Sequence, residues 1–252
     1  MLCAFKLAAA WVVLGVALTA GAIFELLTLR IGARAHFHHV ARFCGKAVFR
    51  IVGVEVRVVN PERLAGRATR LVAFNHSSQI DLFVFSSMMP PYGTPIAKRE
   101  FYWVPFLGWF MYASDVLTVD RSNIERAKRS FAEAARRLRE DRATIFVAPE
   151  GTRSRDGGLG PFKMGLFHLA KDSRVPITPA LIRGAAALHP MGQVVPHPGV
   201  LEVEFLPDVP TDDYTDENLK EKRDELRAIY SAALGLEAAE GQQEEDDRPR
   251  DE

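Results

Sequence analysis

Two blocks of reactive polar residues, each placed directly after a short apolar run, constrain this chain more than any other feature. Residues 71–74 are apolar and lead into residues 75–81, NHSSQID. Residues 143–147 are apolar and β-branched, and soon after them residues 149–154 read PEGTRS. Runs of this kind predict buried strands. Two strand ends that each deliver polar groups into a loop are typical of the active edge of an α/β sheet.

His76 and Asp81 in the first block can act together only in one local geometry. On a continuous helix, five residues leave two side chains about 140° apart, so the pair would not meet. They meet if His76 lies in a turn and Asp81 in the first turn of the next helix. Ser77 or Ser78 as a helix N-cap, with a helix over 81–87, permits this. We therefore predict that His76 is a general base oriented by Asp81.

The second block gives this pair a context that a lone loop histidine would lack. Arg153 supplies a guanidinium suited to an anionic substrate, and Gly151 permits a tight loop. Ser77 and Ser78 are open to a second interpretation, as nucleophiles. No G-x-S-x-G elbow surrounds either serine, which favours capping or hydrogen bonding for both.

Further blocks follow in a recognisable order. Residues 98–108 begin with Lys98 and end in PFLG, and residues 119–121 read VDR. Residues 162–165 read FKMG, and residues 175–179 read VPITP. Together with the first two blocks, they resemble the glycerolipid acyltransferases typified by 1-acylglycerol-3-phosphate O-acyltransferase, over roughly residues 50–205. Several blocks in order are far more specific than any one of them. The chain departs from the family at Asp115, where glycine is usual, at Ala148 and at Thr178.

The resemblance implies a single α/β domain with a mixed central sheet and flanking helices. It implies transfer of an acyl chain from acyl-CoA or acyl-carrier protein to the free hydroxyl of a lysophospholipid, with 1-acyl-sn-glycerol 3-phosphate as the expected acceptor. Arg153 would bind the acceptor's phosphate in a loop shaped by Glu150, Gly151 and Thr152. The resemblance adds three further candidate cations: Lys98, Arg121 and Lys163. We expect no cofactor, no metal and no nucleic-acid partner.

Other functions remain open at this point. The acceptor could be another lysolipid or a lyso-aminolipid. The chain could also be a catalytically silent lipid-binding protein of the same fold, although the intact His76, Asp81, Glu150 and Arg153 argue against this. A serine hydrolase would need the nucleophile elbow that is missing.

The N-terminal region predicts a membrane anchor. Residues 7–24 carry no charge, and as a helix they would be about 27 Å long, near the minimum for crossing a bilayer. Arginine and lysine residues between 30 and 50 follow this stretch, which predicts that the catalytic domain faces the cytoplasm, at the inner membrane or another membrane. Two alternatives are a signal peptide cleaved near residues 20–22, and a hairpin with the basic amphipathic segment 33–51 lying in one leaflet.

Four regions follow from these patterns: an anchor at 1–30, a basic amphipathic segment at 31–53, an acyltransferase domain at 54–236 and an acidic disordered tail at 237–252. The tail holds eight acidic and two basic residues, so the remainder carries 30 basic residues against 24 acidic ones. A mildly basic body suits an anionic lipid surface, although a basic solvated face is an equally ordinary explanation.

Strands and helices alternate through the central region. Strands are expected at 54–59, 70–74, 94–97, 116–119, 143–147, 177–182 and 200–205. The clearest helix is 123–140, with Ser122 and Glu125 as a capping box and an apolar stripe at Ile124, Ala127, Phe131, Ala134 and Leu138. The aromatic run 101–110 could form an acyl groove, a membrane-facing patch or core. We expect ordinary roles for His168, His189 and His197.

Overall fold

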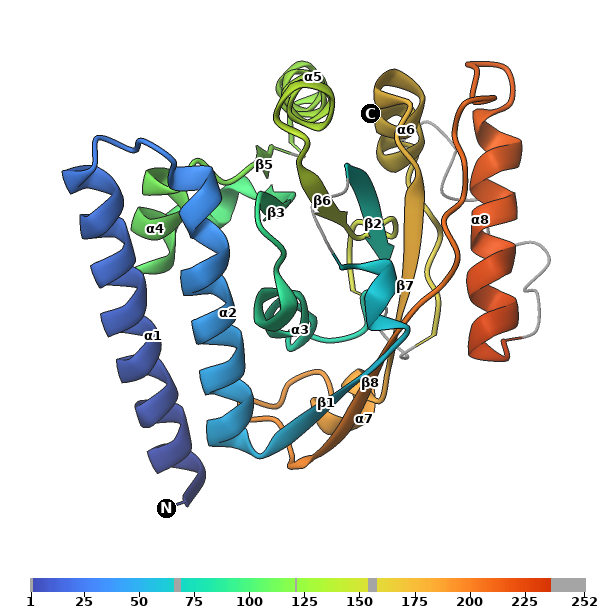
Figure 1. Cartoon of the computed structure of the whole chain (residues 1–252). Helices are drawn as coiled ribbons and strands as arrows, with labels where there is room; N and C mark the ends of the chain where they lie inside the picture. Colours follow the sequence, from blue (N-terminus) through green and yellow to red (C-terminus); the bar gives the residue numbers. More distant parts are fainter. Residues whose placement is uncertain (1, 66–68, 121, 154–157, 237–252) are drawn as a thin grey trace.

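A six-stranded mixed sheet forms the centre of the computed structural model, which describes residues 2–65, 69–120, 122–153 and 158–236 (Figure 1). The sheet order is β1 (Val54–Val59), β8 (Gly199–Phe205), β7 (Ile177–Arg183), β2 (Arg70–Phe74), β6 (Thr144–Val147) and β3 (Gly93–Pro95). All neighbouring strands are parallel except β7 and β8. The predicted α/β class and mixed sheet are confirmed. The tail predicted at 237–252 lies outside the described residues.

One expected strand is divided in two. Of the strand predicted at 94–97, the first part belongs to β3 in the main sheet, and its last residue begins β4 (Ala97–Lys98). β4 pairs with β5 (Thr118–Val119) in a separate two-stranded sheet. A proline at the end of β3 lacks the backbone N–H needed to continue a ladder, which agrees with the break at this point.

Helices cover both faces of the main sheet. On one face lie α5 (Ile124–Asp141), α6 (Gly165–Ser173) and α8 (Leu219–Leu234), packed against Leu71 and Ala73. On the other face lie α2 (Ala33–Val52), α3 (Asp81–Met88) and α4 (Leu107–Ala113), in the core that contains Val72. Strand β2 is therefore buried on both faces, as its unbroken apolar sequence requires. Short helical turns complete the fold: η1 (Pro61–Arg63), η2 (Arg99–Trp103) and α7 (Ala185–Leu188).

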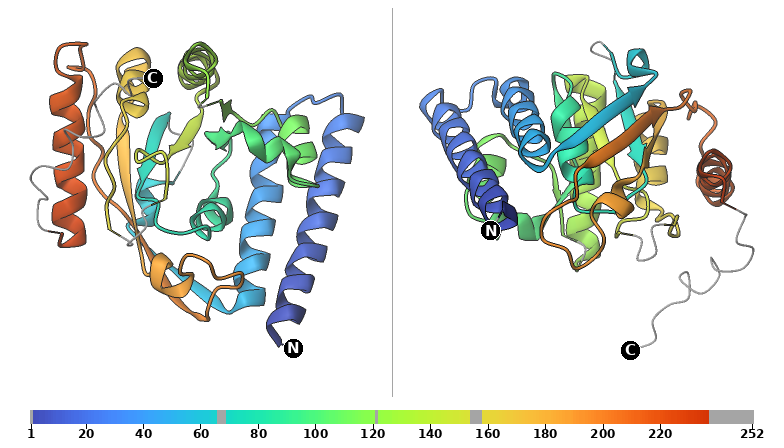
Figure 2. Two further views of the ribbon diagram at one scale, coloured as in Figure 1. Left: turned by 180° about the vertical axis from the view of Figure 1, so that it is seen from behind. Right: turned by 90° about the horizontal axis from the view of Figure 1, so that it is seen from below.

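The helix α1 (Leu2–Leu27) forms a hairpin with α2 at the end of the molecule opposite α8 (Figure 2). Its inner side packs on α2 and α4. Its outer side exposes large apolar side chains, among them Trp11, Val12, Val16 and Leu27. Residues 5–27 of this helix are long and apolar enough to cross a membrane. Both the predicted anchor and the predicted amphipathic segment are helices of this hairpin.

A glycine in α2 sets the position of α3. A Cβ atom at Gly45 would lie 2.4 Å from the backbone nitrogen of Ser87 and 2.7 Å from the carbonyl oxygen of Phe83. Any side chain would therefore push α2 and α3 apart. Because α3 begins at Asp81, this contact helps to place the aspartate of the first block.

The helix caps differ from those predicted. Asn123, and not Ser122, caps α5, because the Asn123 side chain accepts a hydrogen bond from the backbone N–H of Arg126 at 2.9 Å. The Ser122 hydroxyl donates instead to Asp120 at 2.6 Å. No side chain caps α3 at its N-cap position, so the expected serine cap there is also wrong. The expected stripe of α5 is buried at Ala134 and Leu138.

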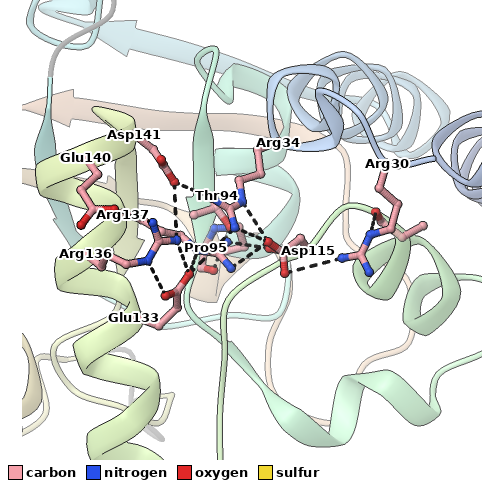
Figure 3. Close-up of polar contacts among 11 residues, drawn as sticks. Arg30, Arg34, Thr94, Pro95, Asp115, Glu133, Arg136, Arg137, Glu140 and Asp141 are labelled. Carbon is pink, nitrogen blue, oxygen red and sulfur yellow. Dashed lines mark hydrogen bonds and ion pairs between the residues drawn. The ribbon is translucent and has the colours of Figure 1, made fainter. Parts of the chain in front are cut away.

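Asp115 connects the α1–α2 hairpin to the rest of the protein (Figure 3). Its carboxylate accepts hydrogen bonds from Arg34, at 2.8 Å from Nε, and from Arg137, at 3.0 Å from Nη2, and Arg30 lies 3.6 Å away. Its backbone has φ of 56°, in the left-handed region that favours glycine. The glycine usual in the family is thus replaced by an aspartate that tolerates this backbone and adds an ionic contact.

Candidate active site

His76 and Asp81 lie together at the end of β2. His76 is in the loop that follows the strand, and its Nδ1 is 2.9 Å from Oδ2 of Asp81, the first residue of α3. Asp81 is fully buried, whereas the His76 side chain is 26% exposed. Because a carboxylate oxygen can only accept, the Nδ1–H group donates this hydrogen bond. Nε2 of a neutral ring then keeps its lone pair. The predicted strand, turn and helix do bring the two side chains into contact.

The turn itself is held by the same carboxylate oxygen. Oδ2 of Asp81 also accepts the backbone N–H groups of Ser77 and Ser78, each at 2.9 Å. The other oxygen, Oδ1, is buried and has no hydrogen-bond partner among the described residues. Asp81 thus fixes both the loop and the ring of His76, and a carboxylate beside an imidazole stabilises the imidazolium form.

Two residues outside the His76–Asp81 pair fix the end of the strand. The side chain of Asn75 donates to the carbonyl oxygen of Ile182 at 3.0 Å and accepts the N–H of Ile182 at 2.7 Å. The hydroxyl of Tyr230, which is fully buried, donates to the carbonyl oxygen of Ala73 at 2.6 Å. The backbone on the N-terminal side of His76 is therefore tied to β7 and α8.

Glu150 of the second block braces the first. Its Oε1 accepts the backbone N–H of His76 at 2.7 Å, and its Oε2 accepts the backbone N–H of Gly160 at 2.7 Å. The residue is 2% exposed, and burial raises the pKa of its carboxyl group to about 7, although its hydrogen bonds favour the charged form. Both oxygens are occupied by the protein, so Glu150 holds the loop that carries His76.

The remaining residues of the second block form a turn near this brace. Gly151 has φ of 71° and donates its N–H to the carbonyl oxygen of Ala148 at 3.1 Å, so the turn uses the freedom of glycine. Thr152 is exposed and Arg153 is half-buried. No ion pair joins Arg153 to another residue in the described ranges.

The three cations suggested by the resemblance occupy different places. Lys98 is exposed at the end of β4. Lys163 is also exposed, and its backbone N–H donates to the carbonyl oxygen of Pro149 at 2.7 Å, beside the second block. Arg121 lies outside the described residues.

An apolar cavity of about 480 Å³ lies beside the turn that joins His76 to Asp81. Gln79 and Ile80 of that turn line the cavity, together with Leu14 of α1 and Phe110 of α4. The aromatic run 101–110 takes more than one of its expected roles. Phe101, Phe106 and Phe110 line the cavity, whereas Trp103 is 88% exposed.

His189 belongs to this region, although the sequence pattern predicted an ordinary role for it. It follows α7, is buried, and places Nδ1 3.2 Å from the hydroxyl oxygen of Ser78. His168 and His197 are exposed. No local signal distinguishes His189 from these two, because its contact spans 111 residues of the chain.

Comparisons with known proteins identify the family of this chain. A family model described as Acyltransferase matches residues 55–183. A 1-acyl-sn-glycerol-3-phosphate acyltransferase of Limnanthes douglasii is 35% identical over 187 residues, which cover 74% of this chain and 66% of that relative. Enzymes of the same name are 31% identical in Saccharomyces cerevisiae, covering 82% of this chain and 69% of the relative, and 30% identical in Escherichia coli, covering 80% and 84%.

A solved structure shows the same fold. It is the crystal structure of the 1-acyl-sn-glycerophosphate acyltransferase PlsC from Thermotoga maritima, with a TM-score of 0.76 and 23% identity over 99% of this chain and 98% of that one. The segment that the family model matches includes His76, Asp81 and Glu150. The chain belongs to the Acyltransferase family.

Proposed function

We propose that this protein transfers an acyl chain from a thioester donor to the free hydroxyl of 1-acyl-sn-glycerol 3-phosphate, giving phosphatidic acid. The contact between His76 and Asp81 carries the proposal, because it sits beside an apolar cavity large enough to accept part of a hydrocarbon chain. The names of the relatives from Limnanthes, yeast and Escherichia coli support this acceptor.

His76 acts as general base in this scheme. Its Nε2 takes the proton from the acceptor hydroxyl while the oxygen attacks the thioester carbonyl carbon. The tetrahedral intermediate then collapses, the C–S bond breaks, and the leaving thiolate receives the proton from the imidazolium. Asp81 stabilises the imidazolium through its 2.9 Å contact with Nδ1. The scheme forms no acyl-enzyme, so Ser77 and Ser78 are not needed as nucleophiles.

The acceptor's phosphate binds at Arg153 in this proposal. The guanidinium is half-buried and has no ion-pair partner among the described residues, and it belongs to the block whose glutamate contacts the His76 loop. An arginine can hold a phosphate by two parallel hydrogen bonds. Gly151 and Thr152 shape the turn, and Lys98, Arg121 and Lys163 are supporting candidates from the resemblance.

The cavity receives the acyl chain of the donor, acyl-CoA or acyl-carrier protein. Its lining comes from α1, α2, α3 and the aromatic run. An acyl chain inserted there, and the thioester at its end, would be shielded from water. The exposed apolar face of α1 and the neighbouring Trp103 and Trp109 would lie in a membrane, where lysophospholipids reside.

We propose that residues 1–30 anchor the protein and that the basic residues of 31–53 face lipid headgroups, with the acyltransferase domain, 54–236, on the cytoplasmic side. Arg42, Lys46 and Arg50 are exposed on α2, which agrees with contact with an anionic surface. Whether the hairpin spans the bilayer or lies in one leaflet would be decided by labelling single cysteines placed along α1 from each side of sealed vesicles.

The decisive experiment is His76→Ala. Removal of the general base should lower turnover about 10²- to 10⁴-fold while both substrates still bind. Asp81→Asn should be nearly as damaging, and the double variant no worse than the more damaging single one. A His76→Ala protein that folds, as judged by circular dichroism, and keeps more than a tenth of wild-type turnover would exclude this mechanism.

A further inference from the structure

His189 makes a buried contact with the first block. The Ser78 hydroxyl oxygen is 3.2 Å from His189 Nδ1 and 3.0 Å from the His189 carbonyl oxygen. Nε2 of the same ring lies 2.8 Å from the carbonyl oxygen of Gln193. Since a carbonyl can only accept, Nε2 carries a proton and donates to Gln193, and Nδ1 is an acceptor when the ring holds that one proton. The single hydroxyl proton of Ser78 therefore lies between two acceptors of one residue, the His189 carbonyl oxygen at 3.0 Å and Nδ1 at 3.2 Å.

Ser78 stands at the centre of the turn that joins His76 to Asp81. Its backbone N–H donates to Asp81, its hydroxyl oxygen lies 3.5 Å from the backbone nitrogen of Ile80, and its side chain is bound by His189. Ser78 is 1% exposed and His189 is 7% exposed, so water does not replace these contacts readily. The backbone carbonyl of residue 189 remains an acceptor in any variant at this position, so the ring acts by fixing where the Ser78 side chain lies and not as its sole acceptor.

His189 also begins a segment that borders the apolar cavity. His189, Gln193, Val194, Val195 and Pro196 line it from one side, and Gln79 and Ile80 line it from another. The Ser78–His189 contact thus joins the cavity wall to the turn that orients the base. Both ring nitrogens of His189 have polar contacts, which fix the orientation of the ring as well as its place.

We propose that His189 is a positioning residue for acyl transfer: through Ser78 it holds the turn that sets the distance between His76 and Asp81. This inference rests on the proposed function of the His76–Asp81 pair. His189 contacts Ser78 and not the reacting atoms, so the positioning role is measured by the turnover number; because His189 also lines the cavity, donor affinity is a separate readout.

Two substitutions at His189 separate its two contacts. His189→Asn places a polar atom near the position of Nδ1 and so can still accept from Ser78, but it does not reach Gln193. His189→Gln reaches toward the Gln193 carbonyl and leaves Ser78 without its side-chain acceptor. His197→Gln, an exposed histidine beyond the same segment, is the matched control.

The variants are compared by steady-state kinetics with an acyl thioester and lysophosphatidic acid in mixed micelles. His189→Gln should lower kcat at saturating donor about 10-fold with the acceptor KM within about 3-fold of wild type, whereas His189→Asn should recover most of the turnover. Ser78→Ala, which removes the hydroxyl altogether, should lower kcat at least as much as His189→Gln, and adding His189→Gln to it should cause no further loss. His197→Gln should behave as wild type.

Other outcomes would overturn the inference. They are a His189→Gln enzyme within 2-fold of wild type, equal losses for His189→Asn and His189→Gln, or losses that multiply in the double variant. If the His189 variants do not fold, Ser78→Ala decides alone, because it deletes one oxygen and an unchanged kcat contradicts the proposal. Activity that survives His76→Ala would show that the proposed function itself fails, whatever the His189 variants do.

Discussion

Replacing Glu150 with glutamine should remove a loss of stability that the wild-type protein suffers as pH rises, while making it a poorer enzyme. The Glu150 carboxylate is 2% exposed and accepts one backbone N–H on each oxygen, from His76 and from Gly160. Glutamine has one acceptor oxygen, so one of these N–H groups would face an amide NH₂ group instead. A buried N–H without an acceptor costs about 1–3 kcal/mol.

The size of the stability effect follows from the pKa of Glu150. Burial raises this pKa from 4.5 to about 7, so the folded protein binds the proton more tightly than the unfolded chain does. The stabilisation of the folded protein by proton binding at Glu150 is fully present below pH 4.5 and is lost as pH rises through 7. A shift of roughly 2.5 units at 1.36 kcal/mol per unit corresponds to about 3 kcal/mol, with an error of about one unit.

Glutamine does not titrate, so the difference in unfolding free energy, variant minus wild type, should grow by about 3 kcal/mol between pH 4.5 and pH 8. Constant costs such as the lost hydrogen bond cancel in this change. The measurement is denaturant unfolding in detergent, followed by circular dichroism, at several pH values. The exposed Glu55→Gln corrects for loss of a surface carboxylate. A difference that changes by less than about 1 kcal/mol over this range would refute the argument.

The Glu150→Gln variant should also have a lower turnover number. Because the brace sets the backbone at His76, Glu150→Gln should lower kcat by about 5- to 100-fold, with little effect on donor KM. Full turnover with the expected pH-dependent stability would mean that the brace is dispensable for positioning the base.

Three further predictions use other parts of the molecule. Arg153→Ala should raise the KM for a phosphorylated acceptor about 10- to 100-fold with donor KM unchanged in steady-state assays, and an equal rise for both would exclude it as phosphate ligand. Asp115→Asn keeps the left-handed backbone but loses the charge, and should lower the unfolding free energy by about 1–2 kcal/mol in denaturant melts. The wild-type protein should sediment with membranes at high salt, whereas an N-terminus near Ile23 would reveal cleavage.

Local features of this protein were predictable because local physics determines them. The strands follow from apolar β-branched runs, and their bounds agree with the sequence pattern for β1 and β2. The meeting of His76 with Asp81 follows from a turn between a strand and a helix. Ser122 and Asn123 are both good capping residues one position apart, and the pattern could not choose between them.

Contacts between distant segments were not predictable in the same way. Glu150 binds the backbone of a residue 74 positions away, and His189 binds one 111 positions away. Such contacts depend on how strands are ordered in the sheet and how helices pack on it, and periodicity reports neither. The resemblance placed Glu150 in the site but not at the His76 backbone. The ion pair of Asp115 depends on Arg34, 81 positions away. The presence of aspartate where the family has glycine did not predict this contact.

The wall that α1 contributes to the cavity has a practical consequence for anyone who wishes to handle the enzyme in water. Leu7, Leu14 and Leu18 of this helix line the same space as Ile80. Removing α1 to obtain a soluble fragment would expose this apolar cavity to water beside the turn that carries His76. The truncated protein would then aggregate, or bind detergent in the cavity in competition with the acyl chain. Inhibitor screens therefore need the full-length chain in a lipid-like environment.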